Sequence, residues 1–277
     1  MNILSIQSHV VLGHVGNSAA TLALQRLGFE VWAVPTVLFS NHPAHGGTAG
    51  DAVAPDAMGA LVGGLDSLGA LARCGAVLSG YLASPGAADV VAEAVAMVRA
   101  HKVAAPYLCD PAFAHEDGLF VSKAVAEAVR TRLIPSASIA APNPFELADL
   151  TKVPVDSLES ALEACRALRG LGPETAICTS LPLGGGALGT LAVAGEEAWL
   201  VETPELPGPL HGAGDLFSAV FLGHTLRGLD LAGALGAAVS GTFGVLEATG
   251  TALDLALVAA QDEIVSPSRT FAARKIG

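Results

Sequence analysis

One segment in the last third of the chain carries residue types suited to chemistry on a phosphate. It reads His211-Gly212-Ala213-Gly214-Asp215, and an apolar, helix-forming run follows it. Glycines two residues apart let backbone N–H groups pack around an anion, and the N-terminus of a helix favours negative charge. Asp215 would repel that anion, which makes sense if its carboxylate takes a proton from a hydroxyl group attacking the phosphate. The alternative is a glycine-rich turn in which Asp215 is only the N-cap of the helix.

Two further acids stand at the ends of predicted strands. Asp110 ends the strand predicted at 107–110, and Glu146 follows Asn143 at the start of a predicted helix. Carboxylates at neighbouring strand ends repel each other unless a cation lies between them, and hard oxygen ligands suit Mg²⁺. The alternative for Glu146 is that it compensates the dipole of its own helix.

Polar residues also follow the first two predicted strands. Ser8 stands at the end of the strand predicted at 2–7, and Asn17 is a natural N-cap for the helix after it, although a plain strand-to-helix turn has the same pattern. His42 and His45 follow the second strand with the spacing of a metal pair, but no third ligand accompanies them, so histidines that contact a substrate or solvent are favoured.

Later strand ends offer an aromatic ring and two hydroxyl groups. Tyr81 follows the strand at 76–79, where it either stacks on a ligand ring or packs in the core. Thr179 and Ser180 follow the strand at 175–179, and the loop 183–186 after them could hold a nucleotide phosphate. The chain has no G-x-x-x-x-G-K-[ST] segment, which excludes phosphate transfer of the P-loop type.

Short apolar runs alternate with helical patterns, which is typical of an α/β fold with a mostly parallel twisted sheet covered by helices on both faces, a three-layer αβα arrangement. The paired runs at 188–202 predict an antiparallel edge hairpin, and the proline-rich segment 204–209 a loop rather than a domain boundary. We therefore expect a single domain over residues 1–277. The strands are predicted at 2–7, 31–37, 76–79, 107–110, 139–141, 175–179, 188–193 and 197–202, and the helices near 17–27, 56–72, 86–101, 121–133, 143–150 and 157–170.

Composition narrows the classes of function. With 277 residues, 52% of them hydrophobic, the chain can bury a large core, and its net charge of −12 argues against nucleic-acid binding. Its four cysteines lie far apart, which indicates a reducing, cytoplasmic setting without disulfides. No signal peptide is expected at the N-terminus, and the apolar stretch 231–246 is shorter than the roughly 20 residues of a membrane span, so a buried helix is predicted there.

These motifs together resemble those of the pyridoxal kinases in the ribokinase-like superfamily, nearly end to end. The matching segments are Ser8-His9-Val10-Val11-x-Gly13-His14-x-Gly16-Asn17, Phe39-Ser40-Asn41-His42, Leu78-Ser79-Gly80-Tyr81-Leu82, Asp110-Pro111, Ala141-Pro142-Asn143-x-x-Glu146 and Gly212-x-Gly214-Asp215. The first two are the most specific, whereas many sugar and vitamin kinases share the last.

The resemblance implies a role for each candidate residue. Ser8, His42 and Tyr81 would bind pyridoxal, with Ser8 at the ring nitrogen, and Asp215 would deprotonate the 5′-hydroxymethyl group. Gly212, Ala213 and Gly214 would form the anion hole. Asp110, Asn143, Glu146, Thr179 and Ser180 would bind ATP, and Asp110 and Glu146 would also organise Mg²⁺. The family is also expected to form homodimers, and the resemblance leaves room for a monovalent cation.

The chain departs from the family pattern in several places, including Thr179, where some members carry Lys, and 203–211, which is shorter than the usual closing loop. Pro43-Ala44-His45 replaces polar residues and a tyrosine, Ala112-Phe113-Ala114 replaces a segment that ends in glycine, and a histidine precedes the glycine turn. These departures bear on substrate preference and turnover. Two alternatives stay open: a kinase of hydroxymethylpyrimidine or another small alcohol, and a degenerate protein that binds a B6 vitamer or nucleotide without turnover.

Overall fold

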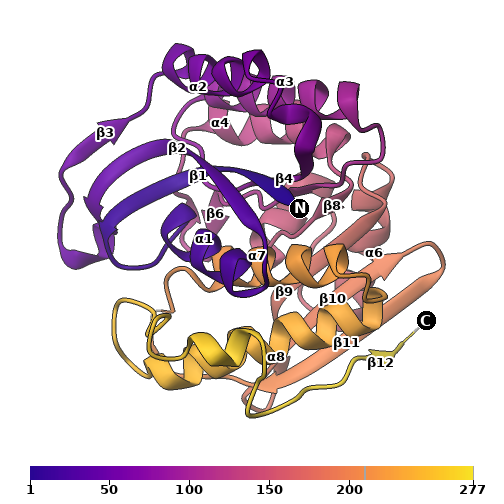
Figure 1. Cartoon of the computed structure of the whole chain (residues 1–277). Coiled ribbons are helices and arrows are strands. Elements are labelled where there is room, and N and C mark those ends of the chain that lie inside the picture. The colour runs from indigo at the N-terminus through magenta and orange to yellow at the C-terminus, as the bar shows by residue number, and fades with distance from the viewer. Residues whose placement is uncertain (209, 277) are drawn as a thin grey trace.

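The structure is a computed structural model that describes residues 1–208 and 210–276. A central ten-stranded sheet runs through the molecule (Figure 1). The strand order is β12-β11-β10-β9-β8-β5-β4-β1-β2-β3. The segment from β2 to β9 along this order is parallel, whereas β3, β10 and β12 pair antiparallel with their neighbours. The strands are β1 (Asn2–Leu12), β2 (Glu30–Asn41), β3 (Gly50–Ala52), β4 (Cys74–Ser79), β5 (Tyr107–Cys109), β8 (Ile139–Ala140), β9 (Thr175–Gly184), β10 (Ala187–Ala194), β11 (Glu197–Pro204) and β12 (Arg274–Lys275), with β6 (Ala114–His115) and β7 (Gly118–Leu119) forming a separate hairpin.

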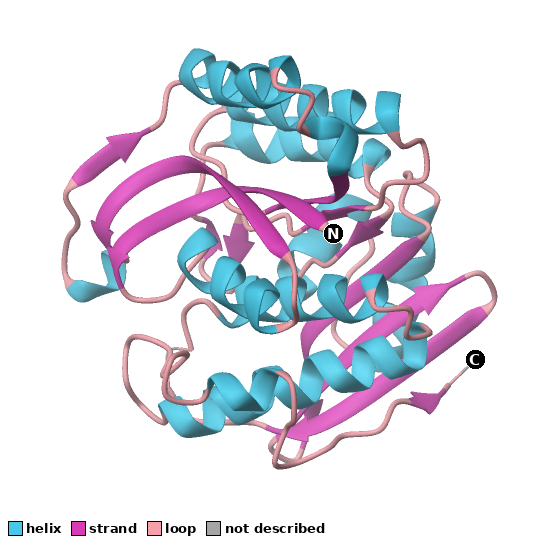
Figure 2. Cartoon of the chain, in the orientation of Figure 1, coloured by secondary structure: helices cyan, strands magenta, loops and turns pink. Residues whose placement is uncertain are grey.

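Helices cover both faces of the sheet and bury two apolar clusters against it (Figures 1 and 2). One face is covered by α2 (Pro55–Ser67), α3 (Pro85–His101), α4 (Lys123–Ala128), α5 (Pro144–Thr151) and α6 (Leu158–Arg169). The other is covered by α1 (Asn17–Arg26), α7 (Ala213–Leu226) and α8 (Leu231–Thr249). The predicted three-layer α/β fold is thus confirmed, and so is the edge hairpin, in which Ala194 of β10 pairs with Glu197 of β11.

Helix α8 is, among the described residues, the one helix long and apolar enough to cross a membrane by length and composition. More than half of its apolar window is buried, and it packs on α7, β10 and β11. The core helix of a globular domain has these same properties, so the buried helix predicted over 231–246 is confirmed, three residues longer than expected.

Several predicted strands are too short. β1 continues through polar Ser8 to Leu12, and β2 continues to Asn41, because the two strands keep pairing beyond a register irregularity between Gln7 and His9. β9 likewise runs through Thr179 to Gly184. Ser8, Thr179 and Ser180 therefore lie within strands, at irregularities in the ladder, and not after the strand ends.

The prediction that Asn17 caps its helix is wrong. The N-cap of α1 is Gly16, without a side-chain cap, and the buried Asn17 amide instead donates to the carbonyl oxygens of Gln7 (3.0 Å) and Val34 (3.2 Å). Both carbonyls lie next to the register irregularity, where the Asn17 amide supplies a donor, and buried backbone carbonyls need one. Asn17 thus holds β1 and β2 at the point where Ser8 leaves the regular ladder.

Helix ends and loops differ in smaller ways. The helix predicted at 121–133 becomes α4 followed by a π-helical segment, Val129–Leu133, and α2 ends five residues before its predicted limit. The loop predicted over 204–209 begins after Pro204, which closes β11, and its Pro209 lies outside the described residues. All four cysteines are buried free thiols, as expected.

Candidate active site

A cavity of about 480 Å³ gathers the residues predicted to bind a substrate. Ser8, His42, Tyr81 and Asp215 all line it, although they come from four separate parts of the chain. Most of the other lining groups are aromatic or apolar, which suits a flat ring with a few polar substituents. The full lining is Ser8, Val10, Val15, Val37, Phe39, His42, Pro43, Tyr81, Ala112, His115, Phe120, His211, Gly212 and Asp215.

Ser8 reaches this cavity because a glycine lies directly against it. A side chain at Gly16 would place its Cβ 2.2 Å from Ser8 Oγ, and Gly16 has a φ of 53° that only glycine adopts easily. Ser8 is 8% exposed, so its hydroxyl is nearly enclosed and faces the cavity. The side chain of Tyr81 also lines the cavity and stacks on Phe120, which decides against the alternative that Tyr81 is only a core residue.

The glycine turn stands between this cavity and a second, smaller one of about 100 Å³. Gly212 lines the larger cavity, whereas Ala213 and Gly214 line the smaller one. Helix α7 begins at Ala213 with Gly212 as its N-cap, at a φ of 87°, so the alternative that Asp215 is the N-cap is wrong. Among the described residues, the backbone N–H groups of Gly214 and Asp215 have no acceptor, which leaves both free for an anion.

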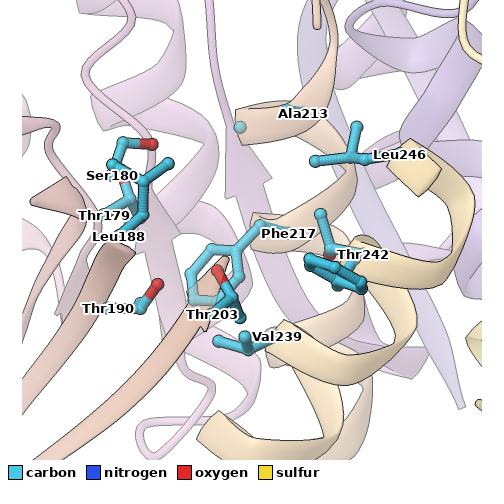
Figure 3. A pocket seen from close by; sticks show the side chains of 12 residues that line it. Thr179, Ser180, Leu188, Thr190, Thr203, Ala213, Phe217, Val239, Thr242 and Leu246 are labelled. Atoms are coloured by element: carbon cyan, nitrogen blue, oxygen red, sulfur yellow. The ribbon is translucent and has the colours of Figure 1, made fainter. Parts of the chain in front are cut away.

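Hydroxyl groups and apolar side chains line the smaller cavity (Figure 3). Thr179, Ser180 and Leu188 form one side, on β9 and β10, and side chains of α8 form the opposite side. Phe217 and Thr203 lie between them. The full lining is Thr179, Ser180, Leu188, Thr190, Thr203, Ala213, Gly214, Phe217, Val239, Thr242, Phe243 and Leu246.

Asp215 is chemically suited to accept a proton. Burial raises its pKa from 3.8 to about 6, and a hydrogen bond with the backbone of Gly16 opposes that rise. A carboxyl group with a pKa near 6 is mostly ionised at neutral pH and more basic than an ordinary aspartate. It lies on the first turn of α7, next to the free N–H groups of the glycine turn.

Asp110 is a buried acid beside the same turn. Its Oδ2 accepts a hydrogen bond from Ser218 (2.9 Å), and a Cβ added at Gly214 would lie 3.6 Å from that oxygen. Burial raises the pKa of Asp110 well above its usual range, and the charges of Glu146 and Asp215 raise it further. The charges of Glu146 and Asp215 thus both act on the buried Asp110, and this repulsion favours a cation beside it.

Glu146 and Asn143 act first as a cap for α5. Asn143 Oδ1 accepts from the N–H groups of Phe145 and Glu146, and Glu146 Oε2 accepts from the N–H of Asn143 (3.0 Å). Glu146 Oε1 also accepts from the N–H groups of Phe113 and Ala114. Burial raises the pKa of Glu146 to about 7, against the lowering effect of these hydrogen bonds.

These hydrogen bonds explain how the altered segment 112–114 is held. Phe113 is fully buried, Asn143 Nδ2 donates to Ala114 O (2.7 Å), and Ala112 turns the chain with a φ of 43°. The capping pair thus fixes this segment from both sides. Neither Asn143 nor Glu146 lines a cavity, so their predicted contact with a nucleotide or metal remains a prediction.

Sequence reasoning missed several lining residues. His115 and Phe120 come from the β6–β7 hairpin, and Thr190, Thr203 and Thr242 come from β10, β11 and α8. The threonine in the apolar run of α8 was a usable signal, because hydroxyl groups in such runs need a partner. Among the described residues no group of three or more His, Cys, Asp or Glu side chains is placed to hold a metal ion.

Comparison with known proteins agrees with this geometry. Residues 58–268 match the model of the phosphomethylpyrimidine kinase family. Pyridoxal kinase PdxY of Rubrobacter xylanophilus is 44% identical over 283 residues, covering 100% of this chain and 98% of the relative. The same enzyme of Corynebacterium diphtheriae is 40% identical, with complete coverage of both.

Solved structures extend the agreement to three dimensions. Pyridoxal kinase from Leishmania donovani, in complex with ADP and pyridoxamine, superimposes with a TM-score of 0.94 at 28% identity, covering 100% of this chain and 99% of that one. Pyridoxal kinase from Trypanosoma brucei gives a TM-score of 0.90, also at 28% identity, with 99% coverage of both chains. The chain therefore belongs to the pyridoxal kinase family and is an ATP-dependent kinase.

Proposed function

We propose that this chain transfers the γ-phosphate of ATP to the 5′-hydroxymethyl group of pyridoxal, which salvages vitamin B6 as pyridoxal 5′-phosphate. The observation that carries the proposal is the pair of cavities on either side of the turn 212–214, with Asp215 at their junction. One cavity suits an aromatic ring and the other a nucleotide. Relatives with this fold include structures with ADP and pyridoxamine or pyridoxine bound.

Catalysis in this proposal rests on one base and one anion site. Asp215 takes the proton of the substrate hydroxyl as its oxygen attacks the γ-phosphorus, and the bond between that phosphorus and the β–γ bridging oxygen breaks to release ADP. The N–H groups of Gly214 and Asp215 stabilise the charge on the transferring group, with Gly212 and Ala213 shaping the turn. Ser8, His42 and Tyr81 hold the substrate ring.

The nucleotide is proposed to occupy the smaller cavity. Thr179 and Ser180 offer hydroxyl groups on one side of it, and Phe217 offers an apolar face for the base. Asn143 is proposed to shape this region indirectly, because its side-chain amide groups already bond the backbone of Ala114, Phe145 and Glu146.

A divalent cation fits the acids around the turn. Asp110 is a hard oxygen donor whose carboxyl is crowded by two other acids, and a cation relieves that repulsion. We propose that Asp110 holds Mg²⁺ and that Glu146 contributes mainly negative charge, since its oxygens accept three backbone N–H groups. When bound, Mg²⁺ neutralises the phosphate oxygens. A monovalent cation near the nucleotide remains part of the proposal.

Assembly and location are also proposals. The organisation as one kinase domain over 1–277, without a separate lid domain, is supported by a single sheet that contains strands from both ends of the chain. A homodimer follows from the family resemblance. A cytoplasmic setting is supported by four buried free thiols.

The competing function is a kinase of hydroxymethylpyrimidine, and the family match over 58–268 is the observation that favours it. The test is ADP release with MgATP and, in turn, pyridoxal, pyridoxine, pyridoxamine and hydroxymethylpyrimidine. We expect turnover with pyridoxal. Turnover with the pyrimidine alone would replace the proposed substrate, and pyridoxal binding without turnover would make the chain a binding protein.

A further inference from the structure

Three histidines gather at one side of the larger cavity, two of them at the positions where the sequence departs from its family. The rings of His42 and His211 lie 4.3 Å apart between centroids, with their planes 31° from parallel, and both line the cavity. His45 Nε2 lies 3.1 Å from Asp254 Oδ1. These contacts join the loop after β2 to the segment before α7 and to the segment after α8.

Two further close approaches hold the cluster in place. A Cβ at Gly13 would lie 2.3 Å from Asp254 Oδ1, and a Cβ at Gly212 would lie 2.2 Å from the carbonyl oxygen of His14. The loop after β1 therefore packs against both supporting segments. The side chains of His45 and Asp254 are 24% and 30% exposed, so the hydrogen bond between them is partly shielded from solvent.

The His42–His211 pair and a second group of rings, Tyr81, Phe120 and His115, line the same cavity. Tyr81 stacks on Phe120 at 6.3 Å, and His115 stacks on Phe120 at 5.4 Å. A flat aromatic substrate in this cavity has ring side chains from both groups to pack against, which is favourable for neutral rings. His211 is also four residues before Asp215, on the same turn, so its ring sets where a bound ring lies relative to the base.

The charge of the pair matters because the rings are close. The pKa of His42 is lowered to about 4, mainly by burial, with His211 and His45 adding to the lowering and Asp254 opposing it. Burial also lowers the pKa of His211, with Asp254 opposing and His45 adding to the effect. Both rings are thus neutral at neutral pH. The other titratable groups facing the cluster or the cavity are His14, Tyr81, His115 and Asp215.

We propose that His211, stacked on His42 and braced by the His45–Asp254 pair, is a substrate-positioning residue. The neutral pair forms the wall against which the substrate ring lies, so proton uptake by the pair weakens substrate binding without slowing phosphoryl transfer. This inference rests on the proposed function, because it takes pyridoxal as the occupant of the cavity. Since one proton must leave before the ring binds, Kd rises by up to tenfold for each pH unit below the midpoint.

Two substitutions separate stacking from titration. His211→Phe keeps an aromatic ring and removes the titrating nitrogens, whereas His211→Ala removes both. We expect KM for pyridoxal to rise about tenfold in the Ala variant and less than threefold in the Phe variant, with kcat changed less than threefold in both. His101→Ala is the matched control, because His101 pairs with Asp66 at the surface and lines neither cavity.

The pH readout uses direct binding in a background where Asp215 cannot titrate. Calorimetry gives Kd for pyridoxal between pH 5 and pH 8 with Asp215→Asn and with Asp215→Asn/His211→Phe. The titration of pyridoxal itself is common to both proteins and cancels in the ratio. We expect Kd to weaken more in acid in the first protein than in the second. Equal pH dependence, or an Ala variant with the KM of the control, would overturn the inference.

The brace is tested by Asp254→Asn, compared with Asp66→Asn in the surface pair. We expect only the first to raise KM, by about threefold to tenfold, and equal KM values would refute the brace. Wild-type protein that binds pyridoxal with this pH dependence but releases no ADP would refute the proposed function and leave the positioning role intact. If the wild-type protein turns pyridoxal over and His211→Ala leaves KM unchanged, the proposed function stands and the positioning role is refuted.

Discussion

Replacing Asp215 by asparagine changes the rate and the stability in opposite directions. Asn cannot accept the proton of the substrate hydroxyl, so kcat should fall by about 10²–10⁴-fold, the range for a lost general base. The side chain keeps its size and its oxygen, so the cavity and the N–H groups of the glycine turn should stay in place, and the affinity for ATP should change little.

The stability effect follows from the raised pKa of Asp215. The pKa rises from 3.8 to about 6 in the folded chain. This shift corresponds to a loss of at most about 3 kcal/mol in the free energy of unfolding once the group is ionised. Well below pH 3.8 the group is protonated in both the folded and the unfolded state, so it contributes nothing. As pH rises to 6, the unfolded state releases its proton first and the wild type loses stability relative to the Asn variant. Above pH 7 the full difference is present.

Two measurements check this reasoning. Coupled ADP release gives kcat, and urea unfolding at pH 4.5, 6 and 8 gives the free energy of unfolding of both proteins. We expect the stability of the Asn variant relative to the wild type to increase with pH, up to about 3 kcal/mol at pH 8. Near-normal turnover would refute the role as base. A stability difference that is constant across these pH values would refute the burial of a charged carboxylate.

Three other substitutions test the elements that position the site. Asn17→Ala leaves two buried carbonyl oxygens without donors and should cost about 2–4 kcal/mol in urea unfolding, and a loss under 1 kcal/mol would contradict the assigned hydrogen bonds. Gly212→Ala drives a Cβ into the carbonyl oxygen of His14 and should lower kcat at least about 100-fold, whereas Gly195→Ala, also at positive φ but with open space around it, should leave kcat unchanged. Ala112→Gly relieves a left-handed backbone and should raise the free energy of unfolding by about 1 kcal/mol, measured in the same way; a loss of stability would show that the φ of 43° is not strained.

The alternation of strands and helices was readable from the sequence because burial on both faces of a parallel sheet leaves continuous apolar runs. The same logic placed Asp110 and Glu146 at neighbouring strand ends, since the ends of parallel strands meet at one edge, and in the folded chain the charge of Glu146 raises the pKa of Asp110. It failed at Ser8, because a strand that contains polar residues and a register irregularity has no periodic signature. The amide of Asn17 is set by that irregularity, so its contacts could not be read locally.

The second cavity was the harder part to predict. Thr190, Thr203 and Thr242 come from three elements, and no spacing in the sequence relates them. The hairpin that carries His115 and Phe120 is two short strands, each below the length at which alternation can be recognised. These rings meet Tyr81 only in the folded chain, where Phe120 stacks on both Tyr81 and His115.

The turn at 212–214 is a partition with a different pocket on each side, one aromatic and one lined by hydroxyl groups. A single molecule that joins a pyridine ring to an adenosine through a chain of phosphates could therefore fill both pockets across this partition. Binding of one half would hold the other at high local concentration, and such linkage can raise affinity by about 10²–10⁴ over either half. Selectivity for such a linked inhibitor therefore depends on the length of the linker that joins its two groups across the turn.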